Sequence, residues 1–246
     1  MAEYYTSKKI IDNCVVAIRK PETFYSQDFI NYRSRTTDND RLCTELIAEF
    51  LLEEENFKKL DEIATCSRTK VHKKYDMNHQ GKYPLFANHD REKIIAIDLY
   101  NQSQEQGAFD YIGKIIDYQT PLKTKITDPY GEIDILSVND NEKDVYILEL
   151  KRGKAKKSET MLRCVLEAFT YYKIVDGPNL LKEFGKEEYN IRISPLVFIG
   201  DDQYNEWVDM NKGNRPNLKA LMEKVGATPF FLKPQDIKYR YTVTKG

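Results

Sequence analysis

A chain of 246 residues with 41% hydrophobic content is long enough for one large domain or two small ones with a sizeable core. The 38 Lys and Arg residues nearly balance the 39 Asp and Glu residues, which excludes a general basic excess for nucleic-acid binding and leaves only a local patch. The 4 cysteines stand singly, which argues against a zinc ribbon or a disulfide framework. The longest apolar run near the start, residues 14–18, is too short for a signal peptide or a membrane span, so we expect a cytoplasmic protein without membrane contact.

The first 108 residues are the least regular part of the pattern. The apolar segment 10–18 predicts a strand. Residues 37–64 predict an amphipathic helix, because apolar residues recur at helical spacing after several candidate N-caps. Glu45 and Glu49 are four residues apart and therefore share one face of that helix, for which a solvated acidic face is the simplest interpretation. In the segment 65–108, the histidines lack the spacing of a metal-binding helix, and the apolar stretch 94–97 fits either a strand or a helix.

The pattern becomes regular after residue 108. Segments 113–122, 131–136, 145–151 and 191–200 predict strands, and the apolar spacing from residue 162 to about 175 predicts an amphipathic helix. The resulting order, β-β-β-α-β, is typical of an α/β domain. Residues 201–246 predict a C-terminal extension that packs on this core, with Trp207 in core packing and a helix at 217–225.

Charged residues interrupt two of these strands. Asp134 lies between two isoleucines, and Glu149 lies between two leucines. Carboxylates in such surroundings are unfavourable unless they are paired or bind a metal. Side chains alternate along a strand, so Glu149 and Lys151 project from the same face. Two carboxylates and a lysine on adjacent strands suit the hydrolysis of a phosphodiester with Mg²⁺ or Mn²⁺, which take oxygen ligands.

The pattern Asp134…Glu149-Leu150-Lys151, in its strand-strand-helix-strand setting, resembles the signature of the PD-(D/E)xK nuclease superfamily. The resemblance covers roughly residues 110–200. It implies an α/β fold with a restriction-endonuclease-like core, in which helices flank a central mixed β-sheet, together with N-terminal and inserted segments. Residues 1–108 would be the N-terminal segment, with a core helix at 37–64 and an insertion at 65–108. Residues 109–200 would be the nuclease-like core, and residues 201–246 the extension.

The same resemblance assigns roles to single residues. Asp134, Glu149 and Leu150 would form the metal-binding set, and Lys151 would position or activate water. Many members carry another acid on the first core helix, for which Glu45 is the candidate and Glu49 the alternate. Some relatives have a Gln-x-x-x-Tyr pair on the helix after the second motif strand, where this chain has Glu167 and Tyr171.

Basic residues cluster directly after the motif. Phosphate contacts are expected from this region, and the candidates are Arg152, Lys154, Lys156, Lys157 and Arg163. A solvated basic loop and a surface ion pair between Arg163 and Glu167 are the simpler alternatives.

The sequence therefore predicts a Mg²⁺-dependent (or Mn²⁺-dependent) nuclease with DNA as the expected substrate. One alternative is a nuclease-like fold that has lost activity and binds nucleic acid or protein. Another is an α/β enzyme that uses Asp134 and Glu149 as an acid/base pair, although the neighbouring Lys151 would depress the pKa that an acid catalyst needs raised. Cutting both strands of a duplex would favour a homodimer, but no strong interface stripe is visible in the sequence.

Overall fold

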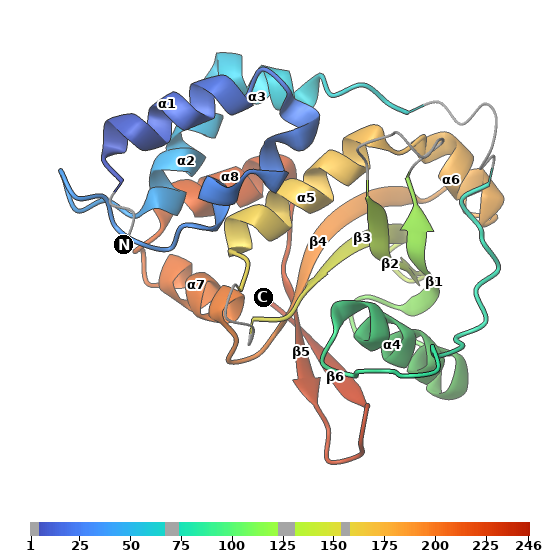
Figure 1. Ribbon diagram of the computed structural model, residues 1–246. Helices are drawn as coiled ribbons and strands as arrows, with labels where there is room; N and C mark the ends of the chain where they lie inside the picture. The colour runs from blue at the N-terminus through green and yellow to red at the C-terminus, as the bar shows by residue number, and fades with distance from the viewer. Residues whose placement is uncertain (1–4, 67–73, 123–130, 154–157) are drawn as a thin grey trace.

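The computed structural model describes residues 5–66, 74–122, 131–153 and 158–246. They form an α/β protein around a six-stranded mixed sheet (Figure 1). The strands lie side by side in chain order: β1 (Lys114–Pro121), β2 (Glu132–Asn139), β3 (Asp144–Lys151), β4 (Asn190–Phe198), β5 (Phe230–Pro234) and β6 (Tyr241–Lys245). The predicted α/β class, the central mixed sheet and the β-β-β-α-β order are confirmed.

Strand directions follow from the connections. Short links make β1, β2 and β3 an antiparallel meander. The chain then crosses over through α5 (Met161–Ile174) and α6 (Gly177–Glu183), so that β4 runs parallel to β3, as a helical crossover requires. Strand β5 is parallel to β4, and β6 closes the sheet antiparallel to β5. The segment predicted as a C-terminal extension thus contributes two strands to the same sheet.

Helices cover both faces of the sheet (Figure 1). On one face, α5 packs against β3 and β4, and the helices from both ends of the chain pack around it. On the other face, α4 (Glu92–Gln106) packs against β1 and β2 and closes a second core with β5 and β6. The remaining elements are α1 (Ser7–Ala17), two 3-10 helices η1 (Pro21–Ser26) and η2 (Asp28–Asn31), α2 (Cys43–Leu52), α3 (Glu54–Asp61), α7 (Asp202–Asn211) and α8 (Pro216–Val225).

Three expectations for the N-terminal half change. The strand predicted at residues 10–18 is wrong, because this segment lies in helix α1, where Ile10 and Cys14 are buried one turn apart. The single helix predicted at 37–64 is two helices, which Glu53 separates with an extended backbone (ψ 133°). The ambiguous stretch 94–97 lies within helix α4, which directly precedes β1. The predicted helix at 217–225 is confirmed as α8, and Trp207 packs on Phe231 with ring centroids 4.8 Å apart.

Among the helices of the described residues, none is both long enough and apolar enough to cross a lipid bilayer.

Candidate active site

The candidate site lies where strands β2 and β3 separate. Ladder pairing between them ends at Ile135 and Leu148. One step further in the same register, Asp134 lies opposite Glu149, and residues directly opposite in an antiparallel pair share a face. The Leu150 amide donates a hydrogen bond to Asp134 Oδ2 at 3.0 Å instead of a ladder bond. The fork therefore places two carboxylates side by side on one face of the sheet.

Lys151 ends strand β3 on the same face and is buried. Its Nζ lies 2.7 Å from Glu149 Oε1, 2.9 Å from Glu159 Oε2 and 2.9 Å from Glu167 Oε2. Burial alone would lower the pKa of this ammonium, but the surrounding carboxylates outweigh burial and hold its pKa well above the usual value. In this arrangement Lys151 is a fixed cation, which can orient an anion or a water molecule but cannot accept a proton.

Helix α5 brings Glu167 and Tyr171 to the fork; their four-residue spacing had predicted only that they share one face of the helix. Tyr171 donates a hydrogen bond to Glu167 Oε1 at 2.9 Å, while the other carboxylate oxygen faces Lys151. Gly131, just before β2, permits this packing, because a Cβ there would lie 2.3 Å from the Tyr171 hydroxyl oxygen. The glycine of the Gly-Glu-Ile-Asp sequence thus lets the strand approach the helix.

Arg163 lies one turn before Glu167 on α5. Its Nε is 2.8 Å from Glu159 Oε1 and 3.8 Å from Glu167 Oε2. Arg163 and Glu167 are therefore paired, but the pair is long and mostly buried at the rim of the acidic cluster, not the surface ion pair of the simpler alternative. With its guanidinium among carboxylates, Arg163 is less available for phosphate contacts than the sequence suggested.

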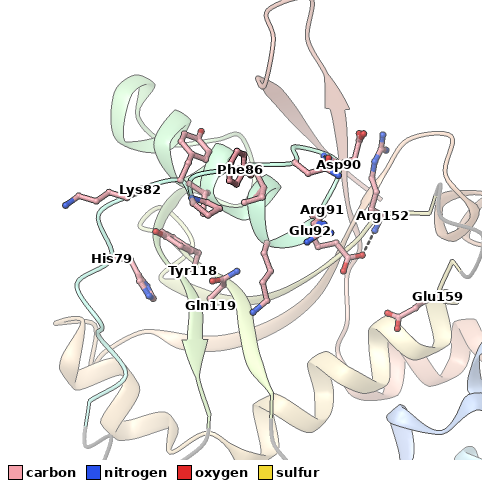
Figure 2. Close-up of a pocket in the computed structure, with 16 residues that line it drawn as sticks. His79, Lys82, Phe86, Asp90, Arg91, Glu92, Tyr118, Gln119, Arg152 and Glu159 are labelled. Carbon is pink, nitrogen blue, oxygen red and sulfur yellow. Dashed lines mark hydrogen bonds between the residues drawn. The ribbon is translucent and has the colours of Figure 1, made fainter.

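Glu92 is a member of the cluster that the sequence pattern did not reveal. It begins helix α4, and its Oε1 accepts a hydrogen bond from the Arg152 amide at 2.8 Å (Figure 2). Burial raises the pKa of Glu92, while Lys151 lowers it. The charge of Glu92 also raises the pKa of Asp134, and the amide that Glu92 binds is next in the chain to Lys151. An acid in the first turn of a helix directly before the first strand was a usable signal, but the helix itself could not be distinguished from a strand.

Negative charge is in excess at this site. Carboxylates of five residues gather around the paired cations Lys151 and Arg163: Glu92, Asp134, Glu149, Glu159 and Glu167. Burial raises the pKa of Asp134 to about 7, with Lys151 opposing the rise and Glu92 and Glu167 adding to it. Burial, followed by Asp134 and Glu167, raises the pKa of Glu149 well above its usual value. Further positive charge would relieve this excess.

A divalent cation fits the donor set. Glu149 Oε2 is buried and has no hydrogen-bond partner in the described part of the chain, which is unusual for a buried carboxylate. No group of three or more His, Cys, Asp or Glu side chains in the described ranges is arranged to hold a metal ion. The predicted set needs fewer, namely Asp134, Glu149 and the backbone carbonyl of Leu150. Mg²⁺ is commonly held by one or two carboxylates, with water and substrate as the other ligands.

The structure does not bring Glu45 to this cluster. Helix α2 packs against α1 and α8, and the two carboxylate oxygens of Glu45 accept hydrogen bonds from the amides of Asn217 and Leu218, each at 2.9 Å. Glu45 therefore binds the N-terminus of α8, where amides without a helical partner and the helix dipole favour a carboxylate. The alternate, Glu49, forms an exposed ion pair with Arg41. Glu92, on helix α4, lies in the acidic cluster, whereas Glu45 and Glu49 do not.

The predicted basic patch is described in part. Arg152 forms an ion pair with Asp201 at 2.9 Å and lies over the Phe198 ring at 4.0 Å, so its guanidinium has partners within the protein. Lys154, Lys156 and Lys157 lie outside the described residues.

Comparisons with known proteins add no relative. No protein-family model matches the chain, and neither does any curated protein sequence or solved structure.

Proposed function

We propose that this protein is a divalent-metal-dependent nuclease that hydrolyses phosphodiester bonds, with DNA as the expected substrate. The meander, the helical crossover and the parallel fourth strand are compatible with a restriction-endonuclease-like core. The chain order of the motif residues agrees with the PD-(D/E)xK resemblance.

The observation that carries the proposal is the fork between β2 and β3. It sets Asp134 opposite Glu149 and surrounds them with more carboxylates than cations, although burial disfavours each charge. A structural ion-pair network would balance its charges. An excess of buried carboxylates next to a fixed lysine is expected where a dication and a phosphate bind.

Each residue has a part in such a reaction. Asp134 and Glu149 would hold the metal, which would polarise the scissile phosphate and promote ionisation of the attacking water. Lys151 would face the developing negative charge on the phosphate, from a buried position where electrostatic interactions are strong. Glu92 would orient or accept a proton from a water molecule, since its raised pKa makes it a better base than an exposed glutamate.

The direct test uses purified protein with supercoiled plasmid, with single-stranded circular DNA and with single-stranded RNA, in Mg²⁺, Mn²⁺ or EDTA. We expect cleavage that requires the metal and that falls more than about hundredfold in Asp134→Asn. Asp140→Asn is the matched control, because Asp140 lies at the opposite, exposed end of the same hairpin. Absence of cleavage of DNA and RNA in both metals would refute the nuclease assignment.

Lys151→Ala is a less suitable test of the proposed function than Asp134→Asn. Removal of this lysine leaves Glu149, Glu159 and Glu167 without their common cation. Breaking a buried ion pair in this way destabilises a protein by about 3–5 kcal/mol. Loss of activity in that variant would therefore need to be separated from loss of fold.

One observation favours the alternative, a nuclease-like fold that binds without cutting. Three carboxylates already pair with Lys151 Nζ, which a bound phosphate would need as its own partner. One of them belongs to Glu167, at the position where some PD-(D/E)xK nucleases have glutamine. If the protein binds nucleic acid without cutting it, the Glu167→Gln variant should not cut it either. If the protein is an active nuclease, the same variant should retain metal-dependent cleavage, because it frees the lysine while keeping the hydrogen-bonding shape of the side chain.

A further inference from the structure

A large groove opens beside the acidic cluster, between the segment 79–93 and strand β1 (Figure 2). Its volume is about 1090 Å³, slightly above the roughly 300–1,000 Å³ typical of small-molecule pockets. The groove therefore has room for a ligand at least as large as a drug-sized molecule.

One end of the groove is aromatic. His79, Tyr83, Phe86 and Tyr118 line it (Figure 2). The rings of His79 and Tyr118 stack with centroids 4.5 Å apart, and Asp117 holds the histidine with an Nδ1–Oδ1 distance of 2.7 Å. Phe86 is 88% exposed, so its ring is open to a ligand in the groove. The groove thus presents the exposed ring of Phe86 and the partly exposed ring of His79, which the buried Tyr118 backs.

Cations line the same groove. Lys82 and Arg91 are exposed and have no ion-pair partner among the residues that the structure describes. Lys93 lies beside them and pairs with the half-exposed Glu132 at 3.2 Å, an interaction that solvent weakens. Exposed cations beside aromatic rings are suited to an anionic ligand with planar groups.

The groove reaches the candidate active site at three points. Glu92 and Glu159, which belong to the acidic cluster, line its other end. Gln119 also lines it, and the register of β1 and β2 places this residue opposite Asp134. Gln119 has a φ of 50°, in the left-handed region, where a non-glycine residue is strained by about 1–3 kcal/mol. The backbone of β1 is thus distorted at the position that separates the groove from Asp134.

We propose that this groove binds an unpaired strand of nucleic acid and leads it to the fork. Bases of a single strand can stack on Phe86 and on neighbouring rings, while Lys82 and Arg91 bind the phosphates. A regular duplex hides the faces of its bases and leaves exposed rings without a partner. This inference narrows the substrate of the proposed nuclease to single-stranded or locally opened nucleic acid, and to that extent it rests on the proposed function.

The experiment measures binding apart from cleavage. Fluorescence polarisation in EDTA compares a labelled single strand of about 15 nucleotides, as DNA and as RNA, with the same DNA sequence as a blunt duplex. Phe86→Ala is the test variant, and Leu85→Ala is its matched control, because Leu85 is the neighbouring residue, is 91% exposed and does not line the groove. Circular dichroism checks that both variants are folded.

We expect the single strand to bind at least about tenfold more tightly than the duplex. Phe86→Ala should weaken single-strand binding about fivefold to hundredfold, the range for removal of one stacking residue, and Leu85→Ala should leave it unchanged. Lys82→Ala or Arg91→Ala should lower the slope of log K against log salt by about 0.7 for each phosphate that the variant no longer neutralises.

The outcomes separate the two proposals. Strand binding that depends on Phe86, without any cleavage, supports the groove and refutes the nuclease. Cleavage of duplex that is indifferent to Phe86→Ala supports the nuclease and refutes the groove. Equal binding of duplex and single strand, equal effects of the Phe86 and Leu85 variants, or no binding at all also refutes the groove.

Discussion

Two buried carboxylate sites in this protein have opposite character. At the N-terminus of α8, both oxygens of Glu45 accept hydrogen bonds from backbone amides. At the fork, Glu149 Oε2 has no hydrogen-bond partner in the described residues, and carboxylates outnumber the cations that pair with them. The first site is what a structural carboxylate requires, because each of its two oxygens has a hydrogen-bond donor. The second keeps unsatisfied charge, which is expected where a ligand brings the missing partner. Burial of an acid alone therefore does not identify a functional site, whereas an unmatched buried acid is a good candidate.

The largest effect that would test this contrast is on activity, through Glu92. Glu92→Gln removes a charge from the cluster without changing its size, and we expect cleavage to fall about hundredfold, or about 2.7 kcal/mol in the barrier. Initial rates with saturating Mg²⁺ measure the change. Glu105→Gln, at the exposed end of the same helix, should cut at the wild-type rate. Equal rates for the two variants would remove Glu92 from the active site.

A somewhat smaller effect is expected on stability, through Glu45. Glu45→Ala leaves the amides of Asn217 and Leu218 without their acceptor, so the free energy of unfolding should fall by about 2 kcal/mol. Urea denaturation measures it. Glu49→Ala, one turn away with an exposed ion pair to Arg41, should change stability by less than about 1 kcal/mol. The folded Glu45→Ala protein should keep its specific activity; a large decrease would restore Glu45 as a catalytic candidate.

The smallest effect is a gain in stability at the fork. Because the pKa of Asp134 is raised from 3.8 to about 7, the folded protein binds more protons than the unfolded chain between these values, and stability falls as the pH rises through this range. Asp134→Asn removes that decrease. The buried amide needs partners of its own at every pH, so the variant should be less stable than the wild type below about pH 4. In EDTA it should be more stable than the wild type by roughly 1–2 kcal/mol above about pH 7.

Denaturation curves at several pH values measure this gain, with Asp140→Asn as the control. Lys186 lowers the pKa of Asp140, so that residue adds stability which disappears as the pH falls, the opposite sign. An Asp134→Asn protein that is less stable than the wild type at pH 8 would show that the charge at the fork is already compensated within the chain.

The sequence by itself determined the part of the molecule that depends on local pattern. Alternation along one strand placed Glu149 and Lys151 on one face, and a spacing of four placed Glu167 beside Tyr171; that Asp134 joins this face followed only from the strand register. The order of strands and helix from β1 to β4 followed from the same periodicities, with physical causes that act within a few residues. Short apolar segments were harder to assign, because a run such as 10–18 fits both the helical and the strand periodicity, and only its packing partners distinguish the two.

Tertiary structure alone decided which acids meet. Glu45 and Glu92 both stand in the first turn of a helix, and no local rule distinguishes them. The packing of α2 on α8 gives Glu45 a complete set of donors, and the packing of α4 on β1 and β2 brings Glu92 to the fork. The groove likewise forms only when the segment 79–93 lies beside β1. Hydrogen bonds and charges between residues distant in the chain depend on how whole elements pack, and that information is absent from the spacing of residues within any one of them.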